Sequence, residues 1–302
     1  MASGTPVPVT PGDSLDVRRA AVLGHPIAHS LSPVLHETAY RNLGLDRLGW
    51  SYTSVDVTAP VLGDFIDSLD SEWAGLSLTM PLKEVVLPLL DEVDADAASV
   101  RAVNTVVFDD GRRKGYNTDI SGLVGILGDA GVTGGSAVVV GAGATARSAV
   151  AALTSVGVLD ISIVARRADA AQELVEVAAA RGADAVGHGW PGPAQASSIG
   201  PILEADVVVS TVPASAASSL EPPGHPGLLI DVLYDPWPTP LARAWGQAGG
   251  SVVGGLELLV RQAVEQVVLM TGLLPDIDAM RRAGQVVLDA RARASDIAQA
   301  DE

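Results

Sequence analysis

The sequence contains no cysteine, which excludes a disulfide framework and thiol chemistry. Basic residues are scarce, because 19 lysines and arginines stand against 36 aspartates and glutamates, giving a formal net charge of -17. A charge of this sign and size argues against nucleic acid or an anionic membrane as a partner. No two of the five histidines share a predicted helix, which argues against a metal site. No apolar run approaches the length of a membrane span.

The remaining composition is that of a folded protein with two domains. At 302 residues, of which 48% are hydrophobic and 18% charged, the chain is long enough for two packed cores. Residues 1–17 are rich in proline, serine, threonine, glycine and aspartate, and they lack the basic start and apolar centre of a signal peptide. We therefore expect a loose N-terminal tail and a cytoplasmic protein.

A glycine turn in the second half of the chain has the pattern of a phosphate-binding motif. It joins an apolar run at 137–140 to a helical pattern at 147–153. In such a unit the first glycine permits a sharp turn, the second lets backbone N–H groups approach phosphates, and the third small residue lets helix and strand pack closely. A plain tight turn is the alternative, because the pattern alone is weak. The turn consists of Gly141, Ala142, Gly143, Ala144, Thr145 and Ala146.

The sequence around this turn alternates between short apolar strands and helices. This alternation predicts a doubly wound parallel sheet. Segment 185–200 is rich in glycine, proline and serine and is predicted to be a loop. Thr211 and Val212 follow a predicted strand, so they should lie at the carboxyl edge of the sheet and face the glycine turn. The predicted strands are 138–140, 161–164, 207–210 and 229–232, and the predicted helices are about 145–156 and 169–181.

Arginines follow the second strand of this predicted sheet, where the choice between NAD and NADP is made. An acid at this point binds the ribose hydroxyls of NAD, whereas an arginine accommodates the 2′-phosphate of NADP. Here Arg166 and Arg167 come first and no acid stands before Asp169, while Arg147 adds a third cation just after the glycine turn. Guanidinium groups suit a phosphate monoester. The pattern favours NADP, and NAD remains the alternative.

The first half of the chain begins with a predicted strand at 19–23 and a polar loop before a helix at about 34–42. Ser32 is a suitable N-cap for that helix. Capping does not explain Ser30, and two hydroxyls beside a helix N-terminus suit a carboxylate ligand. We therefore weigh two roles for Ser32, structural capping and anion binding.

A second polar loop follows the predicted strand at 73–79, after a strand at 50–57. It carries Thr79 and Lys83 and leads into another helix. Ligand groups of open α/β sheets lie at strand ends, so both side chains are candidate ligand contacts. A solvated lysine is the alternative, although the N-terminus of a helix disfavours a cation.

A hairpin is predicted at 102–108 and 112–116, around an Asp-Asp-Gly turn. Asn104 lies on its first arm, and Thr118 and Asp119 follow the second. Asparagine and aspartate are poor strand formers, so their presence here needs a reason. The simplest reason is that Thr118 or Asp119 caps the helix that follows.

The chain ends in two predicted helices, at 256–273 and about 279–291. The first has an apolar face at helical spacing, and Gln262 and Gln266 lie along the edge of that face.

Taken in order, these segments resemble the shikimate dehydrogenase family over nearly the whole chain from about residue 18. Each segment is modest by itself, but the ordered set is specific. The segments that carry the resemblance are 24–33, 79–83, 102–105, 117–119, the glycine turn, 210–213, Tyr234 with Pro236 and Thr239, and 259–263.

The resemblance implies a two-domain enzyme that reduces 3-dehydroshikimate to shikimate with NADPH, in the pathway to the aromatic amino acids. Lys83 and Asp119 fall on the family's catalytic lysine and aspartate. The residues that fall on its substrate contacts are Ser30, Ser32, Thr79, Asn104, Tyr234 and Gln262. The further residues that we assign to the cofactor are the glycine turn, Arg166, Arg167, Thr211, Val212, Gly255 and Leu258.

The resemblance also divides the chain. It implies a substrate-binding catalytic domain made of residues 18–121 and 256–302, because the final helices return to the first domain. Residues 122–255 form the dinucleotide-binding domain of Rossmann type, and residues 1–17 form the tail. We expect a monomer or a homodimer.

Three positions depart from the family pattern. Ser77 stands where the family often has asparagine, which shortens the reach of this side chain. Leu258 replaces a methionine that packs on the nicotinamide. The segment 165–167 keeps only one arginine of the usual Asn-Arg-Thr in register, which leaves the detailed NADP contacts open.

Two other functions are compatible with the sequence. One is a quinate or aminoshikimate dehydrogenase, which could use NAD, although Ser32 favours shikimate because quinate-using relatives often have threonine there. The other is a non-catalytic relative that senses a dinucleotide or a shikimate-like acid. Retention of both Lys83 and Asp119 argues against such a sensor.

Overall fold

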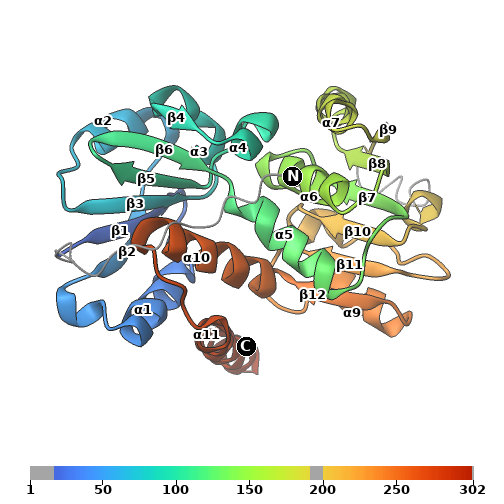
Figure 1. The fold of residues 1–302 in the computed structure, drawn as a ribbon. Helices are drawn as coiled ribbons and strands as arrows, with labels where there is room; N and C mark the ends of the chain where they lie inside the picture. The colour runs from blue at the N-terminus through green and yellow to red at the C-terminus, as the bar shows by residue number, and fades with distance from the viewer. Residues whose placement is uncertain (1–16, 191–199, 301–302) are drawn as a thin grey trace.

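The chain folds around two six-stranded β-sheets that lie side by side, with helices α5 (Thr118–Asp129) and α10 (Gly255–Thr271) between them (Figure 1). The computed structural model of the protein describes residues 17–190 and 200–300. Apart from Val17, the predicted tail lies outside the described residues. Helices α5 and α10 pack on each other and so connect the two halves of the molecule.

The first sheet is mixed and has the strand order β2-β1-β3-β5-β6-β4. Strand β1 pairs in parallel with β2 and β3, whereas β3, β5 and β6 are antiparallel. The predicted hairpin is β5–β6, and its turn places Asp110 and Gly111 at positive φ, as a two-residue hairpin turn requires. The strands of this sheet are β1 (Arg19–Gly24), β2 (Ser51–Asp56), β3 (Trp73–Leu78), β4 (Glu92–Val93), β5 (Thr105–Asp109) and β6 (Arg112–Tyr116).

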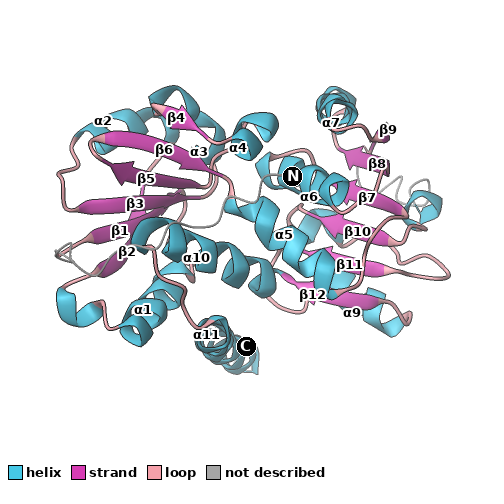
Figure 2. Ribbon diagram, viewed as in Figure 1, coloured by secondary structure: helices cyan, strands magenta, loops and turns pink. Residues whose placement is uncertain are grey.

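Helices cover both faces of this sheet (Figure 2). On one face α1 and the C-terminal helices α10 and α11 bury a core that includes Leu35, Tyr52 and Val260. On the other face the short helices α2 and α3 bury Leu62 and Leu82. The C-terminal helices therefore return to the first half, as expected. The helices not yet given are α1 (Ser32–Leu43), α2 (Leu62–Asp67), α3 (Leu82–Val85), α4 (Ala95–Val100) and α11 (Ile277–Ala300).

The second sheet is wholly parallel and has the order β12-β11-β10-β7-β8-β9, the order of a Rossmann-type dinucleotide-binding fold. The predicted doubly wound parallel sheet is thus confirmed. Val140 pairs with Ser210 and with Val164, so the exits of these strands meet at one edge. The strands are β7 (Ser136–Val140), β8 (Asp160–Ala165), β9 (Asp184–Gly189), β10 (Val207–Ser210), β11 (Leu228–Asp231) and β12 (Ser251–Gly254), and the helices are α6 (Ala144–Ser155), α7 (Ala168–Ala180), α8 (Ala214–Ala217) and α9 (Pro240–Gln247).

Two sequence predictions about this half and the C-terminus are wrong. The segment 185–200 was expected to be a loop, but Asp184–Gly189 forms the edge strand β9, and residues 191–199 lie outside the described part. Pairing with β8 outweighs the weak strand preference of glycine there, and at Gly187 the sheet approaches α7 closely. Helix α11 continues to Ala300 instead of ending near residue 291.

Candidate active site

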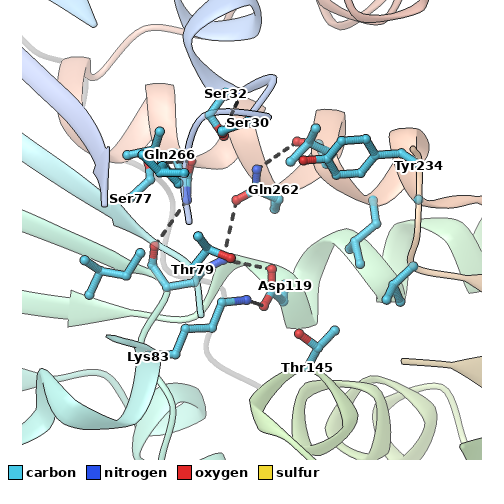
Figure 3. A pocket seen from close by; sticks show the side chains of 18 of the residues that line it. Ser30, Ser32, Ser77, Thr79, Lys83, Asp119, Thr145, Tyr234, Gln262 and Gln266 are labelled. Atoms are coloured by element: carbon cyan, nitrogen blue, oxygen red, sulfur yellow. Dashed lines mark hydrogen bonds and ion pairs between the residues drawn. The ribbon is translucent and has the colours of Figure 1, made fainter. Parts of the chain in front are cut away.

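A cavity of about 310 Å³ opens between the two halves, at the carboxyl ends of strands from both sheets. All eight residues expected to be catalytic or to contact substrate line it. They are joined by Thr145, Gly255 and Leu258 from the cofactor set. Ser30 and Ser32 lie at one end of the cavity and Lys83 and Asp119 at the other, with Gln262 between them (Figure 3). Its volume suits a small molecule.

Lys83 and Asp119 form an ion pair within the cavity. The Lys83 Nζ atom lies 2.5 Å from Asp119 Oδ2, and the side chains are only 14% and 7% exposed. Lys83 is in α3, directly after the loop that leaves β3, and Asp119 is in the first turn of α5. Two separate chain segments thus present a proton donor and a carboxylate to the same space, sheltered from bulk water.

Asn117, and neither Thr118 nor Asp119, caps helix α5. Its side chain accepts a hydrogen bond from the Ile120 N–H at 3.3 Å and donates one to the Ala102 carbonyl at 2.8 Å. The capping role predicted for Thr118 or Asp119 is therefore wrong. Because Asn117 meets the needs of the helix terminus, the Asp119 carboxylate is left to pair with Lys83.

Asn104 holds the second oxygen of this carboxylate. Its amide donates to Asp119 Oδ1 and to Thr118 Oγ1, both at 3.0 Å, and its carbonyl oxygen accepts from the Thr118 N–H at 2.8 Å. Asn104 is almost completely buried. With partners on both sides of the amide, its orientation and that of Asp119 are fixed together.

A buried chain of hydrogen bonds continues behind Asn104. The Tyr52 hydroxyl donates to Ser77 Oγ at 2.6 Å, Ser77 donates to Gln266 Oε1 at 2.8 Å, and Gln266 Nε2 donates to Thr105 Oγ1 at 3.0 Å. Thr105 Oγ1 in turn donates to Asn104 Oδ1 at 2.9 Å. Burial raises the pKa of Tyr52 well above its usual value, so this phenol stays a donor. Ser77, the departure from the family pattern, thus accepts one hydrogen bond and donates another within the protein.

Sequence reasoning missed Tyr52 and assigned no role to Gln266. A tyrosine in a half-buried strand looks like ordinary core, so Tyr52 carried no signal. Gln266 did carry one, because it lies one helical turn beyond Gln262 on the same edge of an apolar helix, and both are buried.

The serine end of the cavity is built by the start of α1. This helix begins at Ser32, with Leu31 at the N-cap and no side-chain cap, so the predicted capping role of Ser32 is wrong. The Ser32 N–H donates to Ser30 Oγ at 3.2 Å. The Tyr234 ring reaches the same end from the loop after β11 (Figure 3). Three hydroxyl groups thus converge where an anion can accept hydrogen bonds.

His36 of helix α1 contacts Ser32 at this end of the cavity. Its Nδ1 atom lies 2.9 Å from the Ser32 carbonyl oxygen, and its ring stacks on Tyr52 with centroids 3.8 Å apart. Burial lowers the pKa of His36 to about 4, partly offset by the hydrogen bond to Ser32. The imidazole is therefore neutral near pH 7 and donates through Nδ1.

The glycine turn fits a bound pyrophosphate. Gly141 has φ +119°, and a Cβ atom there would lie 2.1 Å from Thr211 Oγ1. Gly143 is the N-cap of the twelve-residue helix α6, is exposed, and receives no side-chain cap. A Cβ atom built on Gly143 meets no heavy atom within 4 Å, so open space lies above the helix N-terminus. Free backbone N–H groups beside open space are the features that phosphate binding requires.

The arginines of this edge divide into two kinds. Arg166 and Arg167 follow β8 and are exposed, with Arg167 only loosely paired to Asp169 at 3.7 Å. Arg147 is instead 14% exposed and lies between Glu84 at 3.2 Å and Glu173 at 3.3 Å. Arg147 is therefore already paired with two carboxylates, whereas the exposed arginines that follow β8 suit a 2′-phosphate.

Gly255 and Leu258 bring the start of α10 to the cavity. A Cβ atom on Gly255 would lie 2.1 Å from the Val232 carbonyl oxygen, so only glycine permits this approach. Leu258 is 6% exposed and lines the cavity, as does Thr145 of the glycine turn. An apolar side chain at this place excludes water from the space between the two ligand sites.

Within residues 17–190 and 200–300, no cluster of three or more histidine, aspartate or glutamate side chains could hold a metal ion. No helix in this part of the chain is long and apolar enough to cross a membrane.

Comparison with known proteins identifies the family. Residues 22–106 match the shikimate dehydrogenase substrate binding domain, and residues 255–283 match the shikimate 5′-dehydrogenase C-terminal domain. The NADP(+) shikimate dehydrogenase of Methanothermobacter thermautotrophicus is 34% identical over 278 residues, which cover 89% of this chain and 96% of that protein. This chain belongs to the shikimate dehydrogenase family.

Solved structures of family members share the fold. Mycobacterium tuberculosis shikimate dehydrogenase is 40% identical, with a TM-score of 0.79 over 89% of this chain and 99% of that one. The Thermus thermophilus enzyme, solved with NADP(H) and shikimate, is 33% identical, with a TM-score of 0.75 and coverage of 89% and 99%. The two-domain architecture expected from the sequence is thereby confirmed.

Proposed function

We propose that this chain is an NADP-dependent shikimate dehydrogenase that interconverts 3-dehydroshikimate and shikimate, working as a reductase in the shikimate pathway. The observation that carries the proposal is the sheltered Lys83–Asp119 ion pair, which shares one cavity with the hydroxyls of Ser30, Ser32 and Tyr234. One end of this cavity can handle a proton and the other can hold a carboxylate. The half of the molecule with the dinucleotide-binding type of sheet borders the same cavity.

The chemistry of the reaction divides between cofactor and protein. Bound NADP(H) supplies hydride transfer, which is the cofactor's own chemistry. In the reducing direction negative charge develops on the substrate's C3 oxygen. Lys83, paired as an ammonium with Asp119, donates a hydrogen bond and then a proton to that oxygen. Asp119 holds the amine in place, and Asn104 holds Asp119.

Binding of the substrate rests on hydroxyl and amide groups. Ser30, Ser32 and Tyr234 bind its carboxylate, and hydrogen bonds to a charged acceptor are the stronger kind. Asn104, Gln262 and Thr79 bind its ring hydroxyls from the middle of the cavity. A site built to pair each hydroxyl rejects analogues that lack one, because buried polar groups are then left unpaired.

The cofactor residues are the glycine turn with Thr211 and Val212 for the pyrophosphate, and Arg166 and Arg167 for the 2′-phosphate. Gly255 and Leu258 border the nicotinamide position. Residues 18–121 with 256–302 form the substrate domain, and residues 122–255 form the cofactor domain. We propose a cytoplasmic monomer or homodimer.

The test is a four-way assay of the purified protein with shikimate or quinate, each with NADP⁺ or NAD⁺. We expect the highest kcat/KM with shikimate and NADP⁺, and loss of turnover in Lys83→Met. A higher kcat/KM with quinate would identify quinate as the substrate, and a higher kcat/KM with NAD⁺ would identify NAD as the cofactor. Binding of shikimate without turnover in any combination would favour the sensor and overturn the enzyme.

A further inference from the structure

Arg291, near the C-terminal end of the described side chains, contacts both halves of the molecule at the serine end of the cavity. Its Nη1 atom donates to the His29 carbonyl oxygen at 3.1 Å and to Asp235 Oδ2 at 2.8 Å. His29 belongs to the loop before α1, and Asp235 belongs to the loop after β11. A single guanidinium on α11 therefore joins the two loops that supply the carboxylate-binding hydroxyls.

Each contact of Arg291 is one residue away from a hydroxyl that we assign to the carboxylate. His29 directly precedes Ser30, and Asp235 directly follows Tyr234. Tyr234 lines the same cavity as the two serines. Burial raises the pKa of Tyr234, and the nearby charge of Arg291 opposes that rise.

The charge balance of the cavity makes this arginine unusual. Among the residues that line the cavity, Lys83 is the only lysine or arginine, and it is committed to Asp119 at the far end. The chain as a whole carries a net charge of -17, which opposes entry of an anion. Arg291 does not line the cavity, but its contact with the His29 carbonyl places a cation beside the serine end, and Asp235 balances part of that charge.

We propose that Arg291 is a positioning residue for carboxylate recognition, which clips the Ser30–Ser32 loop to the Tyr234 loop across the two halves and adds positive charge beside the serine end. This inference rests on the proposed function, because it assigns the serine end to a carboxylate. Partly exposed ion pairs add little to stability, so a role in folding alone does not account for this arrangement. Arg291 and Asp235 are about one-third exposed, at 30% and 32%.

The test compares Arg291→Gln, Arg291→Lys and the control Arg293→Gln, which changes an exposed arginine two residues further along the same helix. Shikimate oxidation is followed with saturating NADP⁺, and then the NADP⁺ concentration is varied. We expect Arg291→Gln to raise the KM for shikimate about tenfold, a loss typical of one charge-assisted interaction. The kcat and the KM for NADP⁺ should stay within about twofold of the unmodified protein. Arg291→Lys should recover part of the loss, and Arg293→Gln should behave as the unmodified protein.

A second measurement separates carboxylate recognition from general disturbance of the loops. Binding of shikimate and of its methyl ester, which lacks the negative charge, is measured by calorimetry on the same variants. The preference for the acid over the ester should shrink in Arg291→Gln. An equal loss for acid and ester, a shift no larger than that of Arg293→Gln, or a fall in kcat alone would overturn the proposal. If the unmodified protein does not turn over shikimate at all, the proposed function itself fails, and the two failures are thus distinguishable.

Discussion

The substrate side of the cavity and the cofactor edge differ in how far their polar groups are already paired. On the substrate side, Asn104, Asp119 and Gln266 are buried and bound to one another or to their neighbours. At the cofactor edge, Gly143 and the arginines after β8 are exposed, and the N-terminus of α6 has no side-chain cap. The substrate side is therefore shaped before any ligand binds, whereas the cofactor edge offers groups whose partners come with the nucleotide.

The difference follows from what each side must recognise. Discrimination among ring hydroxyls needs donors and acceptors of fixed direction, which buried networks supply. Recognition of phosphates depends on charge and on backbone N–H groups, which act well from an exposed edge. Mutations on the two sides should therefore have different signatures.

The largest effect is expected at the ion pair. Lys83→Met should lower kcat about a thousandfold while changing the KM for shikimate little, because general acid catalysis contributes about 10²–10⁴ in rate. Steady-state kinetics with shikimate and NADP⁺ will measure it. Lys114→Met serves as the control, because Lys114 lies on β6 and is paired with Asp109 at the end of β5. An unchanged kcat with a large loss of binding would show that Lys83 only holds the substrate.

The buried chain gives the next largest effect. Gln266→Leu should lower kcat/KM about 30-fold, because Ser77 and Thr105 each lose one hydrogen-bond partner, which costs about 1–3 kcal/mol for each group and loosens Asn104. The KM for NADP⁺ should not change. Gln285→Leu, an exposed glutamine on α11, is the matched control. If Gln266→Leu lowers only the thermal stability and leaves kcat/KM intact, the chain supports the fold without positioning Asn104.

The substrate side should also confer a pH dependence on stability. The pKa of His36 is about 4 in the folded protein and about 6.5 when unfolded. Because burial opposes protonation of His36 in the folded state, its contribution to the free energy of unfolding is fully present above pH 6.5. This contribution falls as the pH drops towards 4. The loss between pH 7.5 and pH 5 should be about 2 kcal/mol. Urea unfolding at both pH values measures it, and His36→Phe should remove this dependence. The exposed His225→Gln should retain it, and a His36→Phe protein with unchanged pH dependence would refute the assignment.

The smallest effect is expected at the cofactor edge. Arg166→Ala and Arg167→Ala should each raise the KM for NADP⁺ up to about tenfold and leave the KM for NAD⁺ unchanged, since an exposed charge contributes about 1 kcal/mol or slightly more to phosphate binding. Arg243→Ala, an exposed arginine on α9, is the control. Equal changes in the KM values for NADP⁺ and NAD⁺ would show that these arginines do not recognise the 2′-phosphate.

The features that the sequence predicted correctly are encoded either in local residue patterns or in the order of short motifs along the chain. The alternation of strands and helices gave the parallel sheet, and the order of short motifs gave the family and the residues of the cavity. Caps were predicted poorly, because Ser32 and Thr118 look like caps when taken alone. In the structure α1 has no side-chain cap and Asn117 caps α5, so Ser32 lines the cavity and the Thr118 hydroxyl pairs with Asn104.

What sequence could not predict depends on contacts between distant residues. Gln266 and Ser77 are 189 positions apart, and Arg291 and His29 are 262 apart. Strand β9 forms because β8 offers an edge to pair with, although its own residues favour a loop. Such features come from tertiary packing, which overrides local preference.

The claim that the substrate side is formed without the nucleotide can be tested most directly by calorimetric titration of shikimate into the nucleotide-free protein. We expect measurable binding that is unchanged in Arg166→Ala with Arg167→Ala and at least tenfold weaker in Ser30→Ala, which loses a hydrogen bond to a charged ligand. Absence of shikimate binding until NADP⁺ is added would contradict it.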